Sequence, residues 1–303
     1  MSRIAVIGSL NIDLVVTTPK VPVMGETVMG SGFMTVPGGK GANQAVAAAK
    51  LGGNVSMIGC VGNDTFAEAL LDNLKHNLVD ITNVKVLDGV PTGTATIVVH
   101  EGNNFIIVDP GANYKITPQM IDTIEDLIKE SCIVVVQLEI PIEVVERVID
   151  IANRYNVKVL LDPAPARNLN DSLLAKVDIL TPNETECEIL TGRPIKSVED
   201  AKEAVVYLTK KGVQNVIITM GGNGVVYNSG KDIIHKSVPK VKVVDTTAAG
   251  DSFSGALAAA LSQGKTFDEA IELGNIVGTL TVMKKGAQIS LPSMEDVQNF
   301  RMK

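Results

Sequence analysis

Residues 133–161 read IVVVQLEIPIEVVERVIDIANRYNVKVLL, and this stretch decides the fold class. A short apolar run at 133–138 is followed by apolar residues at helical spacing over 142–155, and a second apolar run follows at 157–161. Continuous runs of β-branched residues are typical of strands buried on both faces. A strand, a helix and a strand in this order form a right-handed βαβ unit. The stretch therefore predicts two parallel strands covered by a helix.

The same alternation extends along most of the chain. We predict further strands at 4–7, 55–58, 178–180 and 216–219, and further helices at 41–51, 66–77, 118–129 and 198–211. Helices that connect parallel strands cover both faces of the sheet. The predicted fold class is therefore α/β, with three Rossmann-like layers in which helices flank a mostly parallel sheet.

Two segments break this alternation. Residues 14–36 are punctuated by Gly and Pro, and residues 92–108 place two β-type runs around the turn sequence EGNN at 101–104, which predicts a hairpin. We expect a single domain over 1–303, with a small β-sheet lid formed by 14–36 and 92–108. Exposed apolar strand faces in such a sheet would favour a partner, so a lid and a homodimer that forms through it are both open at this point.

Composition and charge exclude several classes of protein. The 303 residues are 45% hydrophobic and 20% charged, which is typical of a protein that buries a core. The net charge is −7 without a basic run interleaved with aromatic residues, so nucleic acid is not an expected partner. No apolar run reaches the roughly 20 residues of a membrane span, and the first residues lack a signal-peptide pattern. We therefore expect no membrane association and a cytoplasmic location. Cys60, Cys132 and Cys187 are widely spaced and odd in number, which favours free thiols.

The sequence VDTTAAGDSFSGA at 244–256 predicts a junction of strand, turn and helix. Small residues from Thr246 to Gly250 would let backbone N–H groups surround a phosphate, which the positive end of the helix would also favour. Asp251 stands beside this site. A carboxylate there is a poor phosphate ligand but a suitable base for an attacking hydroxyl group. The alternative is that Asp251 caps the helix, and the pattern alone leaves both open.

A second glycine cluster, PGGKGANQA at 37–45, opens an Ala-rich helix. Glycine allows close approach of the backbone to a ligand, and Lys40 and Asn43 could hydrogen-bond the hydroxyl groups of a polyol. The alternative is an ordinary glycine turn with Asn43 facing solvent. The Gly-Lys-Ser/Thr ending of a P-loop is missing, so P-loop chemistry is not expected.

Polar residues also follow the predicted strands. Asn11 and Asp13 alternate in an extended segment after the first strand, so their side chains face the same side. Carboxylates commonly hold sugar hydroxyl groups, although an Asx turn is the alternative for such residues. Glu139 follows the strand at 133–138, at the edge where open α/β sheets bind their ligands.

Two further motifs each fit two interpretations. The sequence TPNETE at 181–186 fits a helix capping box as well as a ligand site. The sequence TMGGNG at 219–224 suits contact with nucleotide phosphate or ribose, and a hairpin turn explains it equally well.

Together with QLE at 137–139 and KGAQ at 285–288, these motifs resemble the carbohydrate kinases of the ribokinase (PfkB) superfamily over nearly the whole chain. GGKGANQA at 38–45 and NETE at 183–186 resemble the ribokinase branch more than the fructokinase or adenosine kinase branches. The resemblance implies a ribokinase-like fold and ATP-dependent phosphorylation of D-ribose at its 5-hydroxyl, giving ribose 5-phosphate and ADP. It also implies Mg²⁺ as cofactor and K⁺ as activator.

The resemblance assigns roles to single residues. Asp251 would be the base, and the anion hole would be formed by the backbone N–H groups of Ala248, Ala249, Gly250 and Asp251. The sugar would be held, together with Asp251, by Asn11, Asp13, Gly38, Gly39, Lys40, Asn43 and Glu139. The nucleotide would contact Asn183, Glu186, Thr219, Gly221, Gly224, Gly250 and Asn275, with Glu186 helping to order Mg²⁺ through water. The K⁺ site would comprise Asp245, Thr247, Thr281, Lys284, Gly286 and Ser290, in a loop that closes against the phosphate-binding turn.

Other functions stay open at this point. A related PfkB kinase could act on another pentose, fructose, a deoxysugar or a nucleoside, because the shape of the pocket decides the substrate. A sugar-sensing homologue could keep the fold and lack turnover, although Asp251 and the intact turn at 248–250 argue against it.

Overall fold

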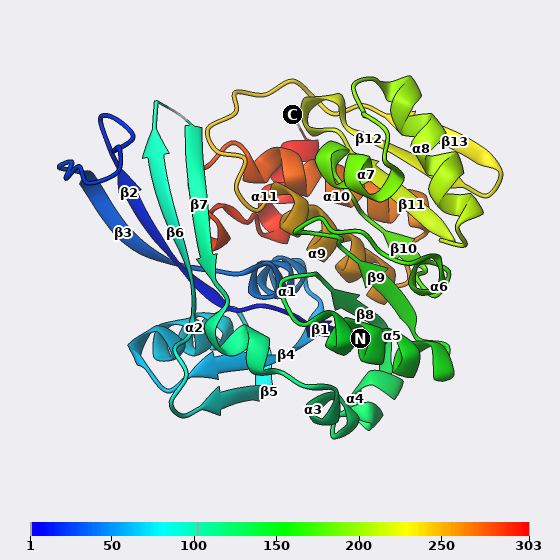
Figure 1. Ribbon diagram of the computed structural model, residues 1–303. Coiled ribbons are helices and arrows are strands. Elements are labelled where there is room, and N and C mark those ends of the chain that lie inside the picture. The colour runs from blue at the N-terminus through cyan, green and yellow to red at the C-terminus, as the bar shows by residue number, and fades with distance from the viewer. Residues whose placement is uncertain (1, 102, 303) are drawn as a thin grey trace.

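The predicted βαβ unit is present. β8 (Ser131–Val136) leads through α5 (Ile142–Arg154) to β9 (Lys158–Leu161), and β8 pairs with β9 in parallel, with Val134 opposite Val159. The structure is a computed structural model that describes residues 2–101 and 103–302 (Figure 1). Nine strands form one sheet in the order β13-β12-β11-β10-β9-β8-β1-β4-β5.

Neighbouring strands of this sheet are parallel from β5 to β11, and β12 and β13 form an antiparallel edge. The other strands are β1 (Arg3–Ile7), β4 (Asn54–Gly62), β5 (Asp80–Leu87), β10 (Ile179–Leu180), β11 (Asn215–Thr219), β12 (Val225–Ser229) and β13 (Asp232–Lys236). The strand order reverses at β1, which lies between β4 and β8. Ligands of open α/β sheets bind at the carboxyl ends of strands beside such a reversal. Residues that follow β1 and β8 therefore lie where a site is expected.

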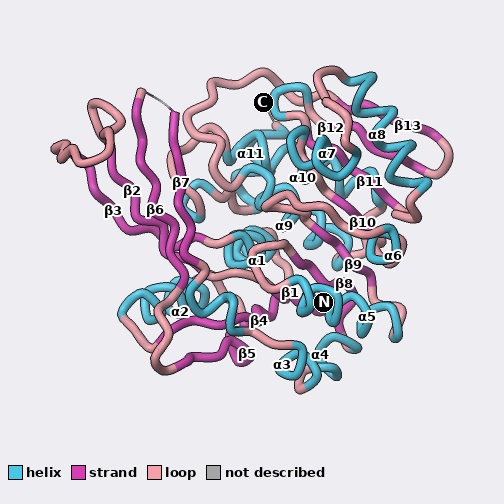
Figure 2. The backbone as a smooth tube through the Cα atoms, viewed as in Figure 1, coloured by secondary structure: helices cyan, strands magenta, loops and turns pink. Residues whose placement is uncertain are grey.

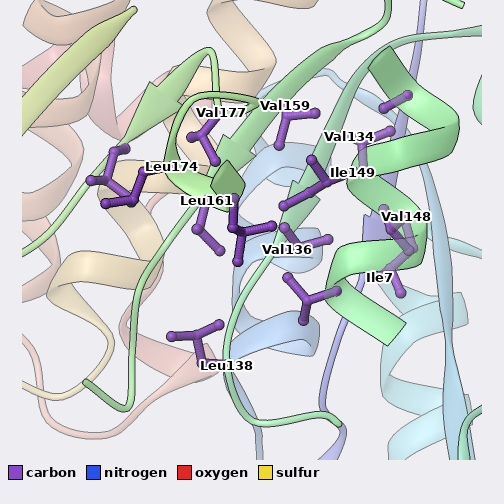
Figure 3. Close-up of a cluster of buried hydrophobic side chains, with 14 of the residues drawn as sticks. Ile7, Val134, Val136, Leu138, Val148, Ile149, Val159, Leu161, Leu174 and Val177 are labelled. Carbon is purple, nitrogen blue, oxygen red and sulfur yellow. The ribbon is translucent and has the colours of Figure 1, made fainter. Parts of the chain in front are cut away.

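Two hydrophobic cores lie on the two faces of the sheet. Side chains alternate between them along β1, with Ala5 and Ile7 in one core and Ile4 and Val6 in the other. Figure 3 shows part of the first core, which contains Ile7 of β1 together with side chains of β8, β9 and α5. The strands read as continuous apolar runs because both of their faces are covered.

Helices cover both faces, which confirms the predicted three layers. The first core is covered by α3 (Pro118–Asp122), α4 (Glu125–Lys129), α5, α6 (Asp171–Leu174), α7 (Glu184–Thr191) and α8 (Val198–Lys210). The second is covered by α1 (Lys40–Lys50), α2 (Thr65–His76), α9 (Ala249–Ser262), α10 (Phe267–Thr281) and α11 (Met294–Arg301). Helices α1 and α9 pack so closely that a Cβ on Gly255 would lie 2.7 Å from the Gln44 carbonyl oxygen. This contact brings the first turn of α1 to α9.

A small separate sheet stands beside the main one, as predicted (Figure 2). Its strands are β2 (Asn11–Thr17), β3 (Ser31–Gly38), β6 (Gly93–His100) and β7 (Asn103–Asp109), in the order β3-β2-β6-β7. β6 and β7 form the predicted hairpin, and Gly102 of its turn lies outside the described residues. β2 begins at Asn11 and pairs in parallel with β6. The small sheet therefore carries Asn11 and Asp13.

Two predictions of secondary structure were wrong. The helix expected at 118–129 is two short helices, because the chain breaks at Thr123, whose hydroxyl donates to the Met120 carbonyl at 2.7 Å. The strand expected before Asp245 is absent from residues 237–246, all of which the structure describes. In this segment the Val244 N–H donates to the Val282 carbonyl after α10, at 2.8 Å, and so does not join the sheet.

Cys60, Cys132 and Cys187 are free thiols, as predicted. Across residues 2–101 and 103–302, the structure contains no helix with the length and apolar character needed to span a bilayer.

Candidate active site

Asp251 lies in the first turn of α9 but does not cap this helix. The capping position is held by Ala248, and no side chain there accepts a hydrogen bond from the first turn. The Asp251 carboxylate accepts hydrogen bonds from Asn43 Nδ2 at 2.8 Å and from Gln44 Nε2 at 3.2 Å. The capping alternative is therefore wrong, because two amides of α1 hold this carboxylate, which is only 5% exposed.

The start of α9 has the properties of an anion site. The first N–H groups of a helix have no acceptor within it, which leaves the N–H groups of Gly250 and Asp251 without an intrahelical partner. Ala248 has a φ of 59°, a left-handed conformation that a residue with a Cβ rarely adopts and that is common at functional sites. The Ala249 N–H was predicted for the anion hole, but in the structure it donates to the Thr246 carbonyl at 3.2 Å.

Gly38 and Gly39 pack against the polar residues that follow β1. A Cβ on Gly38 would lie 2.5 Å from both carboxylate oxygens of Asp13. Gly39 has a φ of 88°, and a Cβ there would lie 2.6 Å from the Asn11 backbone nitrogen. Gly38, at the end of β3, therefore leaves room for the Asp13 carboxylate, and Gly39 allows the start of α1 to pack closely against β2.

Asn11 and Asp13 alternate along β2, so both are strand residues and neither forms the alternative Asx turn. Asn11 Oδ1 accepts a hydrogen bond from Asn113 Nδ2 at 2.7 Å. Asn113 lies in a 3-10 helix, η1 (Gly111–Lys115), and its Oδ1 also accepts from the Leu10 N–H at 2.9 Å. Sequence analysis missed Asn113, because only the folded chain brings it to Asn11.

Glu139 lies beyond the end of β8 and joins two other segments. Its carboxylate accepts hydrogen bonds from the Ser9 hydroxyl and from the Lys40 N–H, the latter at 3.2 Å. These bonds connect the ends of β1 and β8 to the start of α1. Ser9 had been assigned no role, although it lies one residue after the glycine that ends the first apolar run.

The charges of this cluster act on one another. Burial, together with the charges of Glu139 and Asp251, raises the pKa of Asp13 to about 7. Burial alone would lower the pKa of Lys40. Four carboxylates, led by Asp251, outweigh burial and raise the pKa of Lys40 overall, and the other three are Asp162, Glu139 and Glu186. Lys40 is therefore a cation that offsets the repulsion among these groups.

Two buried residues of the cluster were missed as well. Gln44 was part of the glycine motif without a role, and Asp162 follows β9. Gln44 Nε2 donates to Asp162 Oδ2 at 2.7 Å, and Gln44 Oε1 accepts from Gln137 Nε2 at 2.6 Å. Burial raises the pKa of Asp162 well above its ordinary value, which Lys40 only partly opposes.

Asn43 is 5% exposed, so the alternative in which it faces solvent is wrong. Its Nδ2 is bonded to Asp251, while its Oδ1 is buried without a hydrogen-bond partner among the described residues. A buried acceptor without a partner is costly, and a ligand hydroxyl would satisfy it.

A cavity of about 820 Å³ opens on the other side of Gly250, which is a common size for a small-molecule site. Within the part of the chain that the structure describes, Asn275 Nδ2 on its wall is buried and has no partner. The lining includes the predicted nucleotide residues Asn183, Thr219, Gly221, Gly224, Gly250 and Asn275. The irregular segment at 237–246 also contributes to the lining, with Val238, Pro239, Lys240, Val241, Val243 and Thr246, and only Thr246 had been singled out, for the phosphate turn.

Glu186 differs from the other residues predicted for the nucleotide. Asn183 and Glu186 form the capping box of α7, in which Glu186 Oε2 accepts from the Asn183 N–H at 2.8 Å. Glu186 is not among the residues that line the cavity. Burial raises the pKa of Glu186, and the charge of Asp251 adds to this effect.

The 219–224 motif is both a turn between β11 and β12 and part of the cavity lining.

Comparison with known proteins identifies the family. The model of the pfkB family of carbohydrate kinases matches residues 1–294. The chain belongs to this family. Ribokinase of Bacillus subtilis (strain 168) is 42% identical over 301 residues, 99% of each chain. Deoxyribokinase of Salmonella typhi is 38% identical over 299 residues, 98% of each chain. The structure is also similar to that of Arabidopsis thaliana ribokinase complexed with ribose and ATP, with a TM-score of 0.92, 34% identity and 98% of each chain covered.

In this carbohydrate kinase the loop after α10 contacts the turn before α9. Asp245 accepts hydrogen bonds from the N–H groups of Thr247 and Gly286, both at 2.9 Å. Burial raises the pKa of Asp245, but these bonds and the Thr247 hydroxyl outweigh it and hold the pKa below its usual value. The hydroxyl groups of Thr281 and Ser290 donate to the Val277 and Ala287 carbonyls, at 2.8 and 2.7 Å.

Among residues 2–101 and 103–302, no three His, Cys, Asp or Glu side chains are grouped so that they could hold a metal ion. A divalent ion here would depend on phosphate oxygens and water for most of its ligands, which is the usual arrangement for Mg²⁺ in kinases.

Proposed function

We propose that this carbohydrate kinase is a ribokinase, which transfers the terminal phosphoryl group of ATP to the 5-hydroxyl of D-ribose and releases ribose 5-phosphate and ADP. One observation carries the proposal: Asp251 lies between a cluster of buried polar side chains and a cavity of nucleotide size, and amides of α1 hold its carboxylate. The ribokinase relative at 42% identity over nearly the full chain supports the substrate.

Phosphoryl transfer requires positioning, charge stabilisation and a base. Asp251 would accept the proton of the attacking hydroxyl group, which then bonds to the phosphorus as ADP leaves. The N–H groups of Gly250 and Asp251 and the positive end of α9 would stabilise the negative charge that develops on the transferred group. The low exposure of Asp251 supports this role, because electrostatic interactions are stronger where water is excluded.

The sugar would occupy the cluster on the other side of Asp251. Its hydroxyl groups would donate hydrogen bonds to Asn11, Asp13 and Glu139. They would accept hydrogen bonds from Lys40. Asn43 Oδ1, which has no partner among the described residues, would gain one from a hydroxyl group. Gly38 would contribute by leaving room for the Asp13 carboxylate, and Gly39 by allowing the start of α1 to approach Asn11.

The nucleotide would fill the 820 Å³ cavity, where Asn275 Nδ2 would find an acceptor. Mg²⁺ would arrive with ATP and neutralise phosphate charge. The residues fit such an ion only through water, because Glu186 is not among the residues that line the cavity and its carboxylate accepts hydrogen bonds from Asn183. Glu186 would thus act by ordering water around the ion.

We also propose that K⁺ activates the enzyme. Asp245 is held ionised and connects the phosphate-binding turn to the loop at 281–290, so a cation there would tighten this connection. The hydroxyl groups of Thr281 and Ser290 already donate to carbonyls, so backbone oxygens of Thr281, Lys284 and Gly286, with Thr247 and Ser290 nearby, would supply the remaining ligands.

The small sheet would serve as a lid and as a dimer interface. Its outer strands expose large apolar side chains: Phe33 on β3 and Ile107 on β7 are each 66% exposed. Pairing two such sheets would bury these side chains. A cytoplasmic location fits the use of ATP and the three free thiols, because free thiols persist in reducing compartments.

The test measures ADP release with Mg²⁺ and ATP over ribose, 2-deoxyribose, fructose, adenosine and no sugar, each in K⁺ and in Na⁺. Turnover that depends on ribose and rises in K⁺ supports the proposal. The second candidate is a 2-deoxyribose kinase, which the 38% identical deoxyribokinase favours, and it predicts faster turnover with 2-deoxyribose. If ribose raises the melting temperature while no sugar is phosphorylated, the protein is a sugar sensor and the proposal fails.

A further inference from the structure

A buried chain of side-chain hydrogen bonds runs behind Asp251. Gln137 Nε2 donates to Gln44 Oε1 at 2.6 Å, and Gln44 Nε2 donates both to Asp162 Oδ2 at 2.7 Å and to Asp251 Oδ1 at 3.2 Å. Because Gln44 Oε1 is occupied by a donor, its amino group must face the two carboxylates. The two hydrogens of that amino group match the two acceptors.

The chain is shielded from water. Gln137 is fully buried, Gln44 is 1% exposed, and Asp162 and Asp251 are each 5% exposed. Water therefore does not replace a lost bond in this chain at low cost, and hydrogen bonds to charged groups are among the strongest in proteins. The four residues come from α1, from α9 and from the segments after β8 and β9, so the chain connects one helix pair to the ends of two strands.

The carboxylate of Asp251 is held at both oxygens by consecutive residues of α1, with Asn43 on Oδ2 and Gln44 on Oδ1. Two donors on two oxygens fix the plane of the carboxylate and hence the direction of its remaining lone pairs. Asn43 Oδ1 has no partner among the described residues and could accept from the proposed sugar, whereas both atoms of the Gln44 amide are bonded to Gln137, Asp162 and Asp251. The geometry therefore makes Asn43 the residue that could contact the ligand and Gln44 the residue that supports the Asp251 carboxylate.

We propose that Gln44 is a positioning residue for Asp251, and that Asp162 holds Gln44 in place so that the carboxylate of the base faces the attacking hydroxyl group. This inference rests on the proposed role of Asp251 as base. Misalignment of a catalytic group by about 1 Å can cost 10²-fold in rate, and this gives the scale of the effect.

Asp162 acts through its carbonyl-type oxygen and does not need its charge. The N–H of Gln44 requires only an acceptor, and burial favours the protonated form of Asp162, as its raised pKa indicates. An asparagine at this position still offers an acceptor of the same shape, whereas leucine offers none. The two substitutions therefore separate the hydrogen bond from the charge.

The first experiment compares Gln44→Met with Gln263→Met. Gln263 Nε2 donates to the Leu51 carbonyl at 2.9 Å, so it joins the same two helices, α1 and α9, at their other ends. We expect Gln44→Met to lower kcat about 10- to 100-fold with KM for ribose within about threefold of the wild type, the loss typical of one hydrogen bond to a charged group. Gln263→Met should keep kcat within about twofold, with a smaller loss of thermal stability because Gln263 is exposed, and the melting temperature of both variants is measured beside the rate. Equal kcat in the two variants would overturn the proposal.

The second experiment tests whether Gln44 acts through Asp251. Gln44→Met is combined with Asp251→Asn, and product is followed over long incubations. If Gln44 only positions the base, adding Gln44→Met to the Asp251→Asn variant, which already lacks the base, lowers kcat by less than about threefold. A full 10- to 100-fold further loss would mean that Gln44 acts elsewhere and would refute the inference. If Asp251→Asn alone keeps the wild-type rate, the assignment of the base fails first, and the positioning role fails with it.

Asp162 supplies a test that does not depend on how Gln44→Met folds. Asp162→Asn should keep kcat within about threefold, and Asp162→Leu should lower it about tenfold or more at unchanged KM. Equal rates in the two variants would refute the role of Asp162, as would a loss that appears only in KM.

Discussion

The buried carboxyl group of Asp13 makes a quantitative prediction about stability. Burial and the charges of Glu139 and Asp251 raise its pKa from 3.8 to about 7. Between these two values the folded protein holds a proton that the unfolded chain has released. The contribution of Asp13 to the free energy of unfolding of the sugar-free wild type therefore falls as pH rises from about 4 to 7, and it levels off above pH 7.

The size of the effect follows from the shift. About three pH units at about 1.4 kcal/mol each give roughly 4 kcal/mol. Asp13→Asn has nearly the same shape and no such titration. The free energy of unfolding of this variant should exceed that of the wild type by nearly zero at pH 4. The difference should grow by about 1.4 kcal/mol per pH unit and reach roughly 4 kcal/mol at pH 8.

Urea denaturation of both proteins without sugar, at pH 5, 6, 7 and 8, measures this difference directly. Taking the difference removes the contributions of Asp162 and Glu186, whose pKa values are raised in both proteins. A difference that stays constant across this range, or that shrinks with rising pH, would refute the reasoning. At pH 8 the variant should also bind ribose more weakly, because an amide accepts sugar hydroxyl groups less strongly than a carboxylate.

Four further outcomes are expected. Asp251→Asn should lower kcat by roughly 10²–10⁴-fold while ribose binding by titration calorimetry stays nearly intact, and turnover within tenfold of the wild type would contradict a base at this position. Gly39→Ala should destabilise the protein by roughly 1–3 kcal/mol in urea, because its φ is 88° and the new Cβ would lie 2.6 Å from the Asn11 nitrogen; an unchanged midpoint would count against it. Asp245→Asn should reduce the stimulation of turnover by K⁺ over Na⁺, and equal stimulation would place the cation elsewhere. Ile107→Lys on the lid should produce monomers in analytical ultracentrifugation at micromolar concentration, where the wild type should be a dimer, and a variant that stays dimeric would remove the lid from the interface.

The layers of the fold could be predicted from sequence because strands buried on both faces have an unmistakable pattern. The runs at 4–7 and 133–138 became β1 and β8 within a few residues. The same reasoning failed at 241–244, where β-branched residues form no strand. Propensity describes a residue that fits a sheet, but pairing requires a neighbouring edge, and Val244 bonds to the end of α10.

The candidate site divides in a similar way. Motif residues such as Asn43 and Asp251 could be found because unusual residue types cluster at helix starts. Asn113 and Asp162 could not, because each acts on a residue about one hundred positions away in the chain: Asn113 on Asn11 and Asp162 on Gln44. Local sequence carries no signal for such a contact. Asp251 also shows that a helix start does not decide the role of its carboxylate, since partners from another helix determined where it points.

The parallel pairing of β2 with β6 in the small sheet has a consequence for how the chain assembles. Asn11 pairs with Gly93, and the intervening chain includes β3, α1, β4, α2 and β5. Closing so long a loop costs entropy that only the formed contacts repay, so this sheet should appear late in folding, after the first βαβ unit has brought its ends together. The small sheet is therefore not a cassette that could be excised or grafted onto another kinase, because β2 follows the first strand of the main sheet, β3 leads into α1, and β6 follows β5.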